Sequence, residues 1–292
     1  MNTGTVAAPI DRVGIVGCGT MGSGIAEVCA MAGIDVRVAV SGRDSEYRGR
    51  NRLTASLDRA VSKGRLTESA RDNALSRVSF VTELEGLADR QLVIESVVED
   101  EQAKLHVFKD LDRVLDAPDV VLASNTSSIP IIRLAHATSR PESVVGIHFF
   151  NPVPVLPLVE LVASLATDDT TRGVVERFAV DRLGKQVVWS PDRAGFMVNA
   201  LLIPYLLNAI RMVESGFTSA ESLDRAMELG CNHPMGPLRL ADLIGLDVVA
   251  SIAEAMYQEF KEPLHAPPPL LLRMVEGKAL GRKSGGGFHH YA

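Results

Sequence analysis

The sequence of 292 residues is poor in several features, and each scarcity excludes a class of protein. Its three cysteines, Cys18, Cys29 and Cys231, form no CxxC pair, which argues against a disulfide scaffold, fits a reducing compartment and gives no support for a zinc site. No run of about 18 uncharged apolar residues is present, so we expect no membrane span. Residues 1–11 lack the basic start and apolar stretch of a signal peptide, and we therefore expect a cytoplasmic protein.

The charge balance shows no strong excess of either sign. The 30 lysines and arginines and the 36 aspartates and glutamates give a net charge of -6, which argues against a duplex nucleic-acid partner. An anionic ligand would therefore need a local basic pocket. The hydrophobic content of 46% is enough for a full core, and at roughly 150 residues per domain the length predicts two domains.

The first part of the chain alternates strand-like and helix-like patterns. From Arg12 a short buried strand leads into a helical pattern that ends at Gly33, and a second strand follows at 35–40. Residues 46–75 are charged and amphipathic and predict two helices that stand off the sheet. The alternation predicts an α/β domain over 1–190 with a Rossmann-type, doubly wound parallel sheet. Further strands are expected at 77–82, 91–97, 120–125, 143–150 and 185–190.

The pattern changes at Pro191-Asp192, after which no strand of comparable strength occurs. We expect a second, all-α domain over residues 191–292, which contributes to the substrate cleft and to dimerisation. Its segment 196–213 is apolar almost all round, which predicts a helix buried by other helices or by a second subunit. The sequence therefore favours a homodimer formed through the C-terminal helices.

A glycine-rich turn lies between the first strand and the first helix. Gly17, Gly19 and Gly22, with Thr20 and Met21 between the last two, form the pattern GxGxxG. The first glycine permits the tight turn, the second lets the backbone approach a pyrophosphate, and the third allows close packing of helix on strand. This context predicts a dinucleotide-binding site.

The end of the second strand departs from the usual dinucleotide pattern, which places an acid there to bind the adenosine ribose. Val40 occupies that position, and Ser41, Gly42 and Arg43 follow it. A hydroxyl and a guanidinium suit a 2′-phosphate, so the sequence favours NADP(H) over NAD(H). The alternative is a solvated Arg43, with a 2′-hydroxyl contacted by the backbone or by Asp44; another nearby acid, Glu46, keeps that alternative open.

Four short segments, taken together, are typical of one family of enzymes. They are NTSS at 125–128, HFFNPVP at 148–154, LVE at 158–160 and RAGFMVN at 193–199. With them, the sequence resembles the 3-hydroxyacyl-CoA dehydrogenases, and among these the short 3-hydroxybutyryl-CoA dehydrogenases of bacteria. The resemblance covers nearly the whole chain and extends to 233–247 and 281–288.

The resemblance implies a catalytic set. Hydride removal from a secondary alcohol needs a base for the hydroxyl proton, which the family assigns to His148, and Glu160 would fix the tautomer of that imidazole. Ser127 and Asn199 match positions that hydrogen-bond the reacting oxygen or its neighbours. Considered without their motifs, the last two residues would more simply be helix N-caps.

The resemblance also implies ligand contacts. Asn125 and Asn151 match positions near the cofactor, the second beside the nicotinamide pocket. Glu99 and Lys104 align with residues near the nicotinamide ribose, with a solvated ion pair as the alternative explanation. Ser56 and Lys63 match contacts to coenzyme A, although a helix-surface lysine usually binds nothing. These six positions are therefore expectations from the family, with no metal site among them.

The expected reaction interconverts an (S)-3-hydroxyacyl-CoA and a 3-oxoacyl-CoA, preferably with a C4 acyl chain. A dehydrogenase acting on an acyl-carrier-protein thioester or a small free hydroxy acid would keep the same catalytic pair and is the main alternative. A non-catalytic dinucleotide-binding or structural protein is a more remote one. We expect His289 and His290 to lie in a frayed end without function.

Overall fold

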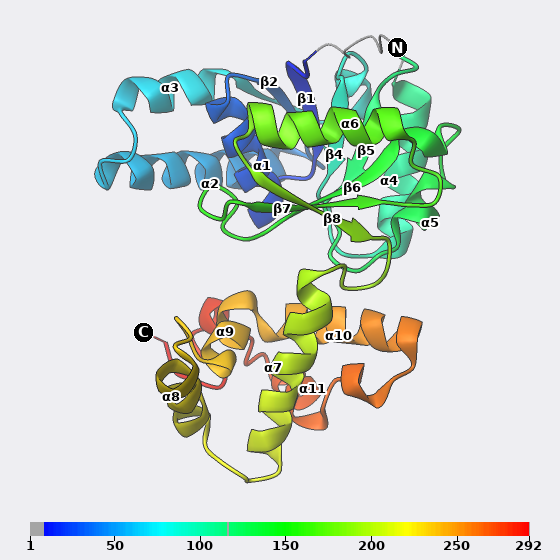
Figure 1. Cartoon of the computed structure of the whole chain (residues 1–292). Helices are drawn as coiled ribbons and strands as arrows, with labels where there is room; N and C mark the ends of the chain where they lie inside the picture. The colour runs from blue at the N-terminus through cyan, green and yellow to red at the C-terminus, as the bar shows by residue number, and fades with distance from the viewer. Residues whose placement is uncertain (1–8, 116, 292) are drawn as a thin grey trace, which may run out of the picture. The chain divides into compact units, whose positions relative to one another are not determined.

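The computed structural model describes residues 9–115 and 117–291, and the chain divides between Asp192 and Arg193 into two compact units. The first unit contains an eight-stranded sheet with the order β3-β2-β1-β4-β5-β6-β7-β8 (Figure 1). Its strands are β1 Arg12–Val16, β2 Asp35–Ala39, β3 Val78–Val81, β4 Leu92–Glu95, β5 Val121–Ser124, β6 Val144–Phe149, β7 Leu158–Ala163 and β8 Gln186–Pro191.

Helices cover both faces of this sheet. In Figure 1, α1 and α6 lie over one face, and α4 and α5 lie over the other. The apolar side chains of α1 and α6 join those of the strands in one core cluster. The helices of this unit are α1 Thr20–Met31, α2 Arg43–Ser62, α3 Glu68–Ser76, α4 Glu101–Val114, α5 Ile131–Ala135 and α6 Asp169–Arg177, with shorter helical turns η1 Leu84–Leu87, η2 Pro141–Ser143 and η3 Phe178–Arg182.

The predicted Rossmann-type sheet and helical C-terminal domain are confirmed, and each predicted strand is present with its ends shifted by at most two residues. The two helices expected from the amphipathic segment are α2 and α3, which extend beyond the sheet as a pair (Figure 1). One strand was not predicted. β7 runs antiparallel to β6, because the connection at 150–157 is shorter than the dozen or more residues that a parallel crossover needs.

The strand β7 changes which residues meet at the carboxyl edge of the parallel strands. β8 runs parallel to β7, so both strands begin at the edge where β6 ends. The loop 150–157 and the residue before β8, Lys185, therefore lie at the same edge as the end of β6. In open α/β sheets this is the edge that binds ligands.

The second unit is helical and has its own apolar core, to which α7, α9, α10 and α11 contribute. In α7, which the sequence predicted to be buried by other helices or by a second subunit, Leu201 is 78% exposed within this chain. No helix among residues 9–115 and 117–291 is both long and apolar enough to cross a bilayer. The elements are α7 Val198–Glu214, α8 Ala220–Cys231, α9 Pro237–Ile244, α10 Leu246–Phe260, η4 Pro263–His265, α11 Pro269–Glu276 and η5 Arg282–Ser284.

The expectation of a frayed C-terminal end is wrong for the described residues. His289 is buried, and its Nε2 lies 2.8 Å from Asp224 Oδ2. Asp242 accepts hydrogen bonds from the backbone N–H of His289 at 2.9 Å and from the Tyr291 hydroxyl at 3.0 Å. Two buried carboxylates thus hold this segment, and a Cβ at Gly287 would collide with Asp242. Sequence reasoning missed this because the partners lie far away along the chain.

Candidate active site

The centre of the candidate site is a histidine and a glutamate on neighbouring strands. His148 of β6 and Glu160 of β7 are direct partners in the antiparallel register, so their side chains stand on the same face of the sheet. His148 Nδ1 lies 2.7 Å from Glu160 Oε2, and both side chains are buried. An ionised carboxylate can only accept a hydrogen bond, so Nδ1 is the donor in this contact, and in the neutral imidazole Nε2 is then the nitrogen with the lone pair.

The other ring nitrogen faces a hydroxyl. Ser127 Oγ lies 3.3 Å from His148 Nε2. Ser127 belongs to the loop that follows β5, the strand paired in parallel with β6, so its position after the strand end brings it to the edge where β6 ends. The structure thus brings together three of the four predicted catalytic residues as a chain from carboxylate to imidazole to hydroxyl.

The fourth predicted catalytic residue, Asn199, belongs to the helical unit. It is buried and is the second residue of α7, whose N-cap is Met197. Ser127 is likewise not an N-cap, since α5 begins after Pro130. The capping role that each residue could have had is therefore not observed for either of them.

The loop that carries Ser127 is anchored by Glu99. One oxygen of this carboxylate accepts hydrogen bonds from Thr126 Oγ1 at 2.5 Å and from the backbone N–H of Ser127 at 2.9 Å. Burial raises the pKa of Glu99, but the charge of Lys104 and the hydrogen bonds from the loop outweigh that effect and hold the pKa below its usual value. Glu99 is thus an anion that fixes the loop, a role the sequence did not indicate.

Lys104 is part of a buried network rather than a solvated ion pair. Its side chain is only 1% exposed, and its Nζ lies 2.7 Å from Glu95 Oε1 and 3.2 Å from Glu99 Oε2. Glu95 also accepts a hydrogen bond from Ser124 Oγ at 2.6 Å. The alternative of a solvated pair is therefore wrong. Sequence reasoning missed Glu95, although an acid at the end of an otherwise apolar strand was a usable signal.

The glycine-rich turn forms a cradle that fits a pyrophosphate. Gly17 has a φ of +98°, and a Cβ there would lie 2.6 Å from the carbonyl oxygen of Ser96. A Cβ at Gly22 would collide with the carbonyl oxygen of Gly17, whereas one at Gly19 would meet nothing within 4 Å. Backbone at Gly19 is therefore open to a ligand, and α1 begins at the next residue, Thr20, with its N–H groups unpaired within the helix.

The residues after β2 present hydroxyls and cations at the start of α2. Val40 is buried in the core, and Ser41 Oγ lies 2.9 Å from Ser45 Oγ. Arg43, the first residue of α2, is exposed, and Arg48 donates to Ser45 Oγ at 3.4 Å. This corner of the sheet therefore offers hydroxyl donors and the Arg43 guanidinium after Val40, together with the acids Asp44 and Glu46 in the first turn of α2.

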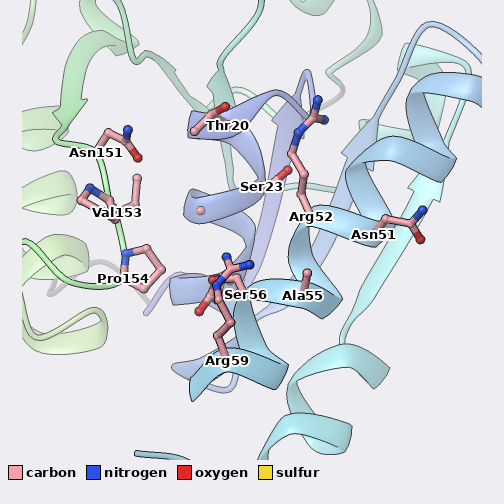
Figure 2. Close-up of a pocket in the computed structure, with 13 residues that line it drawn as sticks. Thr20, Ser23, Asn51, Arg52, Ala55, Ser56, Arg59, Asn151, Val153 and Pro154 are labelled. Atoms are coloured by element: carbon pink, nitrogen blue, oxygen red, sulfur yellow. The ribbon is translucent and has the colours of Figure 1, made fainter. Parts of the chain in front are cut away.

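A groove runs between α1, α2 and the loop after β6 (Figure 2). Ser56, one of the predicted substrate contacts, lines it together with Arg52 and Arg59 from the same helix. Lys63, the other predicted contact, is the exposed C-cap residue of α2 and is not one of the described lining residues. The lining residues are Thr20, Ser23, Gly24 and Glu27 from α1, Asn51, Arg52, Ala55, Ser56 and Arg59 from α2, and 151–154 from the loop.

Arg52 and Glu27 are two charged lining residues of the groove, and each has polar neighbours. Arg52 donates from Nη1 to the carbonyl oxygen of Cys18 at 3.1 Å, which ties α2 to the glycine-rich turn. Glu27 is buried, and burial raises the pKa of its carboxyl, while the neighbouring Ser56 and Arg59 partly oppose that shift. The groove thus brings two guanidinium groups and the Ser56 hydroxyl beside one buried carboxyl, and the guanidinium groups and the hydroxyl can bind an anionic ligand.

The remaining predicted cofactor residues, Asn125, Asn151 and Met21, lie in different parts of the first unit. Asn125 is buried, and its Oδ1 accepts a hydrogen bond from the backbone N–H of Phe149 at 2.9 Å, which ties the end of β5 to the end of β6. Asn151 lines the groove, and Met21 packs partly against the core. Among residues 9–115 and 117–291, no three His, Cys, Asp or Glu side chains gather as a metal site.

Comparisons with known proteins agree over nearly the whole chain. The family model for the 3-hydroxyacyl-CoA dehydrogenase NAD binding domain matches residues 12–193, and the model for the C-terminal domain of the same family matches residues 195–291. A 3-hydroxybutyryl-CoA dehydrogenase of Mycobacterium tuberculosis is 60% identical over 282 residues, which cover 97% of this chain and 99% of that protein.

Solved structures give the same result. The crystal structure of M. tuberculosis FadB2 has a TM-score of 0.96 and 60% identity, covering 98% of this chain and 100% of that one. (S)-3-hydroxybutyryl-CoA dehydrogenase PaaH1 from Ralstonia eutropha has a TM-score of 0.90 and 42% identity, covering 97% and 99% of the two chains. With its two domains each matched by the corresponding family model, this chain belongs to the 3-hydroxyacyl-CoA dehydrogenase family.

Proposed function

We propose that the protein is an NAD(P)-dependent dehydrogenase that interconverts (S)-3-hydroxyacyl-CoA and 3-oxoacyl-CoA, with 3-hydroxybutyryl-CoA and acetoacetyl-CoA as the preferred pair. The observation that carries the proposal is the chain from Glu160 through His148 to Ser127 at the carboxyl edge of the sheet. The relatives named 3-hydroxybutyryl-CoA dehydrogenase support the acyl chain length.

The proton chemistry follows from the different partners of the two ring nitrogens of His148. In the oxidation direction, His148 Nε2 takes the proton of the substrate's 3-hydroxyl as the carbonyl forms. Glu160 stabilises the resulting imidazolium through its contact with Nδ1, as a triad carboxylate does. In the reduction direction the imidazolium returns that proton to the developing alkoxide. Ser127 would donate a hydrogen bond to the same oxygen, and on the motif alone we assign a similar role to Asn199.

The cofactor would lie on the glycine-rich turn. When bound, its nicotinamide accepts or supplies the hydride of the substrate's C3 carbon. The open backbone at Gly19 and the N-terminus of α1 would hold the pyrophosphate, and we keep Asn151 as a contact near the nicotinamide. We further propose that NADP(H) is preferred to NAD(H), since Ser41 and the exposed Arg43 can bind a 2′-phosphate where Val40 replaces the usual acid.

The coenzyme A portion of the substrate would occupy the groove between α1, α2 and the loop after β6. Arg52 and Arg59 supply positive charge there, and Ser56 supplies a hydroxyl. Lys63, the exposed C-cap residue of α2, would act as a point charge toward the coenzyme A phosphates. A groove of this chemistry favours a CoA thioester over a small free hydroxy acid.

The substrate class is tested by the steady-state reduction of acetoacetyl-CoA and of free acetoacetate by the same enzyme. We expect kcat/KM for the thioester to exceed that for the free acid by a factor of about 100 or more, because only the thioester carries the groups that the groove binds. Ser56→Ala combined with Lys63→Ala should lower kcat/KM for acetoacetyl-CoA and leave the value for acetoacetate unchanged. Equal rates on the two substrates would contradict the proposal.

We also propose a cytoplasmic homodimer that associates through the C-terminal helices. The three cysteines are free thiols, two of them buried, as expected in a reducing compartment. The second copy is proposed as the partner of α7 because Leu201, a large apolar side chain on this helix, is 78% exposed.

A further inference from the structure

A buried lysine outside the catalytic chain ties down one wall of the groove. Lys185, the residue before β8, donates from Nζ to the carbonyl oxygens of Val153 at 2.6 Å and of Leu156 at 2.7 Å. Both acceptors belong to the loop 150–157 that joins β6 to β7. Both partners of this ammonium group are backbone carbonyls, no carboxylate among the described residues forms an ion pair with it, and burial lowers the pKa of Lys185. A cation buried without a counter-ion is costly, which indicates a specific role.

The loop held by Lys185 is the wall that faces α1 and α2. Asn151, Val153 and Pro154 lie on one side of the groove in Figure 2, with α2 on the other. Val153 is seated against α1 so closely that a Cβ at Gly24 would lie 2.9 Å from Val153 Cβ. Lys185 therefore holds the loop through the carbonyl groups of Val153 and Leu156, while the side chain of Val153 packs on α1.

The position of Lys185 depends on the antiparallel strand. β8 begins beside the start of β7, and the N–H of Gln186 donates to the carbonyl oxygen of Pro157 at 2.8 Å. The end of the loop is thereby fixed by the backbone. Its middle forms a turn in which the N–H groups of Val155 and Leu156 donate to the carbonyl oxygen of Pro152, each at 3.0 Å, and the lysine side chain ties this turn to the start of β8. A loop of this length without the ammonium group would keep its ends and lose two charge-assisted hydrogen bonds in its middle.

We infer that Lys185 is a positioning residue that fixes the 150–157 loop as the wall of the coenzyme A groove and so sets the affinity for the coenzyme A portion of the substrate. The inference rests on the proposed function of the groove. Because the wall contacts a part of the substrate that does not react, it binds the ground state and the transition state equally. Loosening it therefore raises KM and leaves kcat nearly unchanged.

Lys185→Met tests the inference, because methionine keeps a long unbranched side chain and removes all three N–H donors. We expect KM for acetoacetyl-CoA to rise by about tenfold or more, with kcat within about twofold of the wild type. The Kd of free coenzyme A, measured by calorimetry, should rise by a similar factor. With S-acetoacetyl-N-acetylcysteamine, which lacks the nucleotide part, KM should be the same in variant and wild type.

Leu87→Ala serves as the control for a general loss of stability. Leu87 is buried in η1, which lies before β4 and therefore at the amino ends of the parallel strands, away from the groove wall. This substitution should lower Tm and leave the Kd of coenzyme A unchanged. Lys185→Gln keeps an N–H donor, so its Kd for coenzyme A should lie between those of the wild type and Lys185→Met. If the methionine variant does not fold, the glutamine variant is compared with the wild type instead.

An unchanged Kd of coenzyme A in folded Lys185→Met would overturn the inference, and so would equal increases in KM for the full and truncated thioesters. Failure of the proposed function has a different signature, because the wild type would then bind no coenzyme A and reduce no acetoacetyl-CoA. The two failures are therefore distinguishable.

Discussion

At the scale of single residues, His148 is held at both nitrogens of its ring, by Glu160 at Nδ1 and by Ser127 at Nε2. The motifs predicted these residues, but not the reason they meet. The direct pairing of His148 with Glu160 follows from the antiparallel register of β6 and β7, which the sequence pattern did not reveal. Glu95 and Lys185 were missed for a similar reason, since each acts through contacts with other elements.

The cofactor preference is also decided at the residue scale. If Arg43 binds a 2′-phosphate, NADPH should be preferred to NADH in the reduction of acetoacetyl-CoA. Arg43→Ala should raise KM for NADPH by about tenfold or more and leave KM for NADH unchanged, because a charge-assisted hydrogen bond is worth roughly 1.5–3 kcal/mol. Parallel titrations of the two cofactors measure this, with Arg65→Ala, beyond the end of α2, as the control. A strong preference for NADH that the substitution does not change would contradict the assignment.

At the scale of elements, the strands and the glycine-rich turn were predictable because each is a local pattern in the chain. β7 was not, since its LVE segment was recognised only as a motif and its pairing depends on the short loop before it. The C-terminal segment was predicted to fray because its anchors, Asp224 and Asp242, lie on α8 and α9. Such long-range contacts leave no periodic signal in the sequence.

The loop after β5 yields a prediction about pH. The pKa of Glu99 is lowered in the folded protein, so the ionised carboxylate stabilises the fold above its ordinary value of 4.5 and loses that effect as the pH falls through the lower folded value. Glu99→Gln should therefore lower Tm at neutral pH, and the Tm difference from the wild type should close as the solution is acidified below 4.5. Thermal unfolding across this range measures the difference.

The control is Glu83→Gln, at an exposed position, for which the Tm difference should stay flat with pH. The same loop carries Ser127, so Glu99→Gln should also lower kcat. A Tm difference that persists unchanged well below 4.5 would show that the charge of Glu99 does not stabilise the loop.

At the scale of the whole molecule, the net charge of -6 says little about the ligands. The anionic groups of a dinucleotide and a CoA thioester would be held by a helix N-terminus and a few placed cations, among them Arg43, Arg52 and Arg59. The sequence did predict both domains' architecture, because composition changes sharply after the last strand. It could not show which face of α7 remains uncovered, since burial depends on packing in three dimensions.

The proposed dimer is tested at the exposed start of α7. Sedimentation should show a species of twice the mass of one chain, and Leu201→Lys should shift it toward the monomer, because a charge at a buried apolar contact is unfavourable. Leu165→Lys, at a fully exposed position in the first unit, should leave the dimer intact. A wild-type protein that sediments as a monomer would contradict the dimer.

The most direct test of the central claim is the transient rate of hydride transfer with acetoacetyl-CoA, followed by the absorbance of the reduced nicotinamide, in the wild type and in His148→Gln. Circular dichroism and Tm establish that the variant is folded. If His148 is the proton donor and acceptor, the rate should fall by roughly 100-fold or more, since general acid–base catalysis contributes a factor of that size. A rate equal to that of the wild type would contradict the role of His148 and the mechanism built on it.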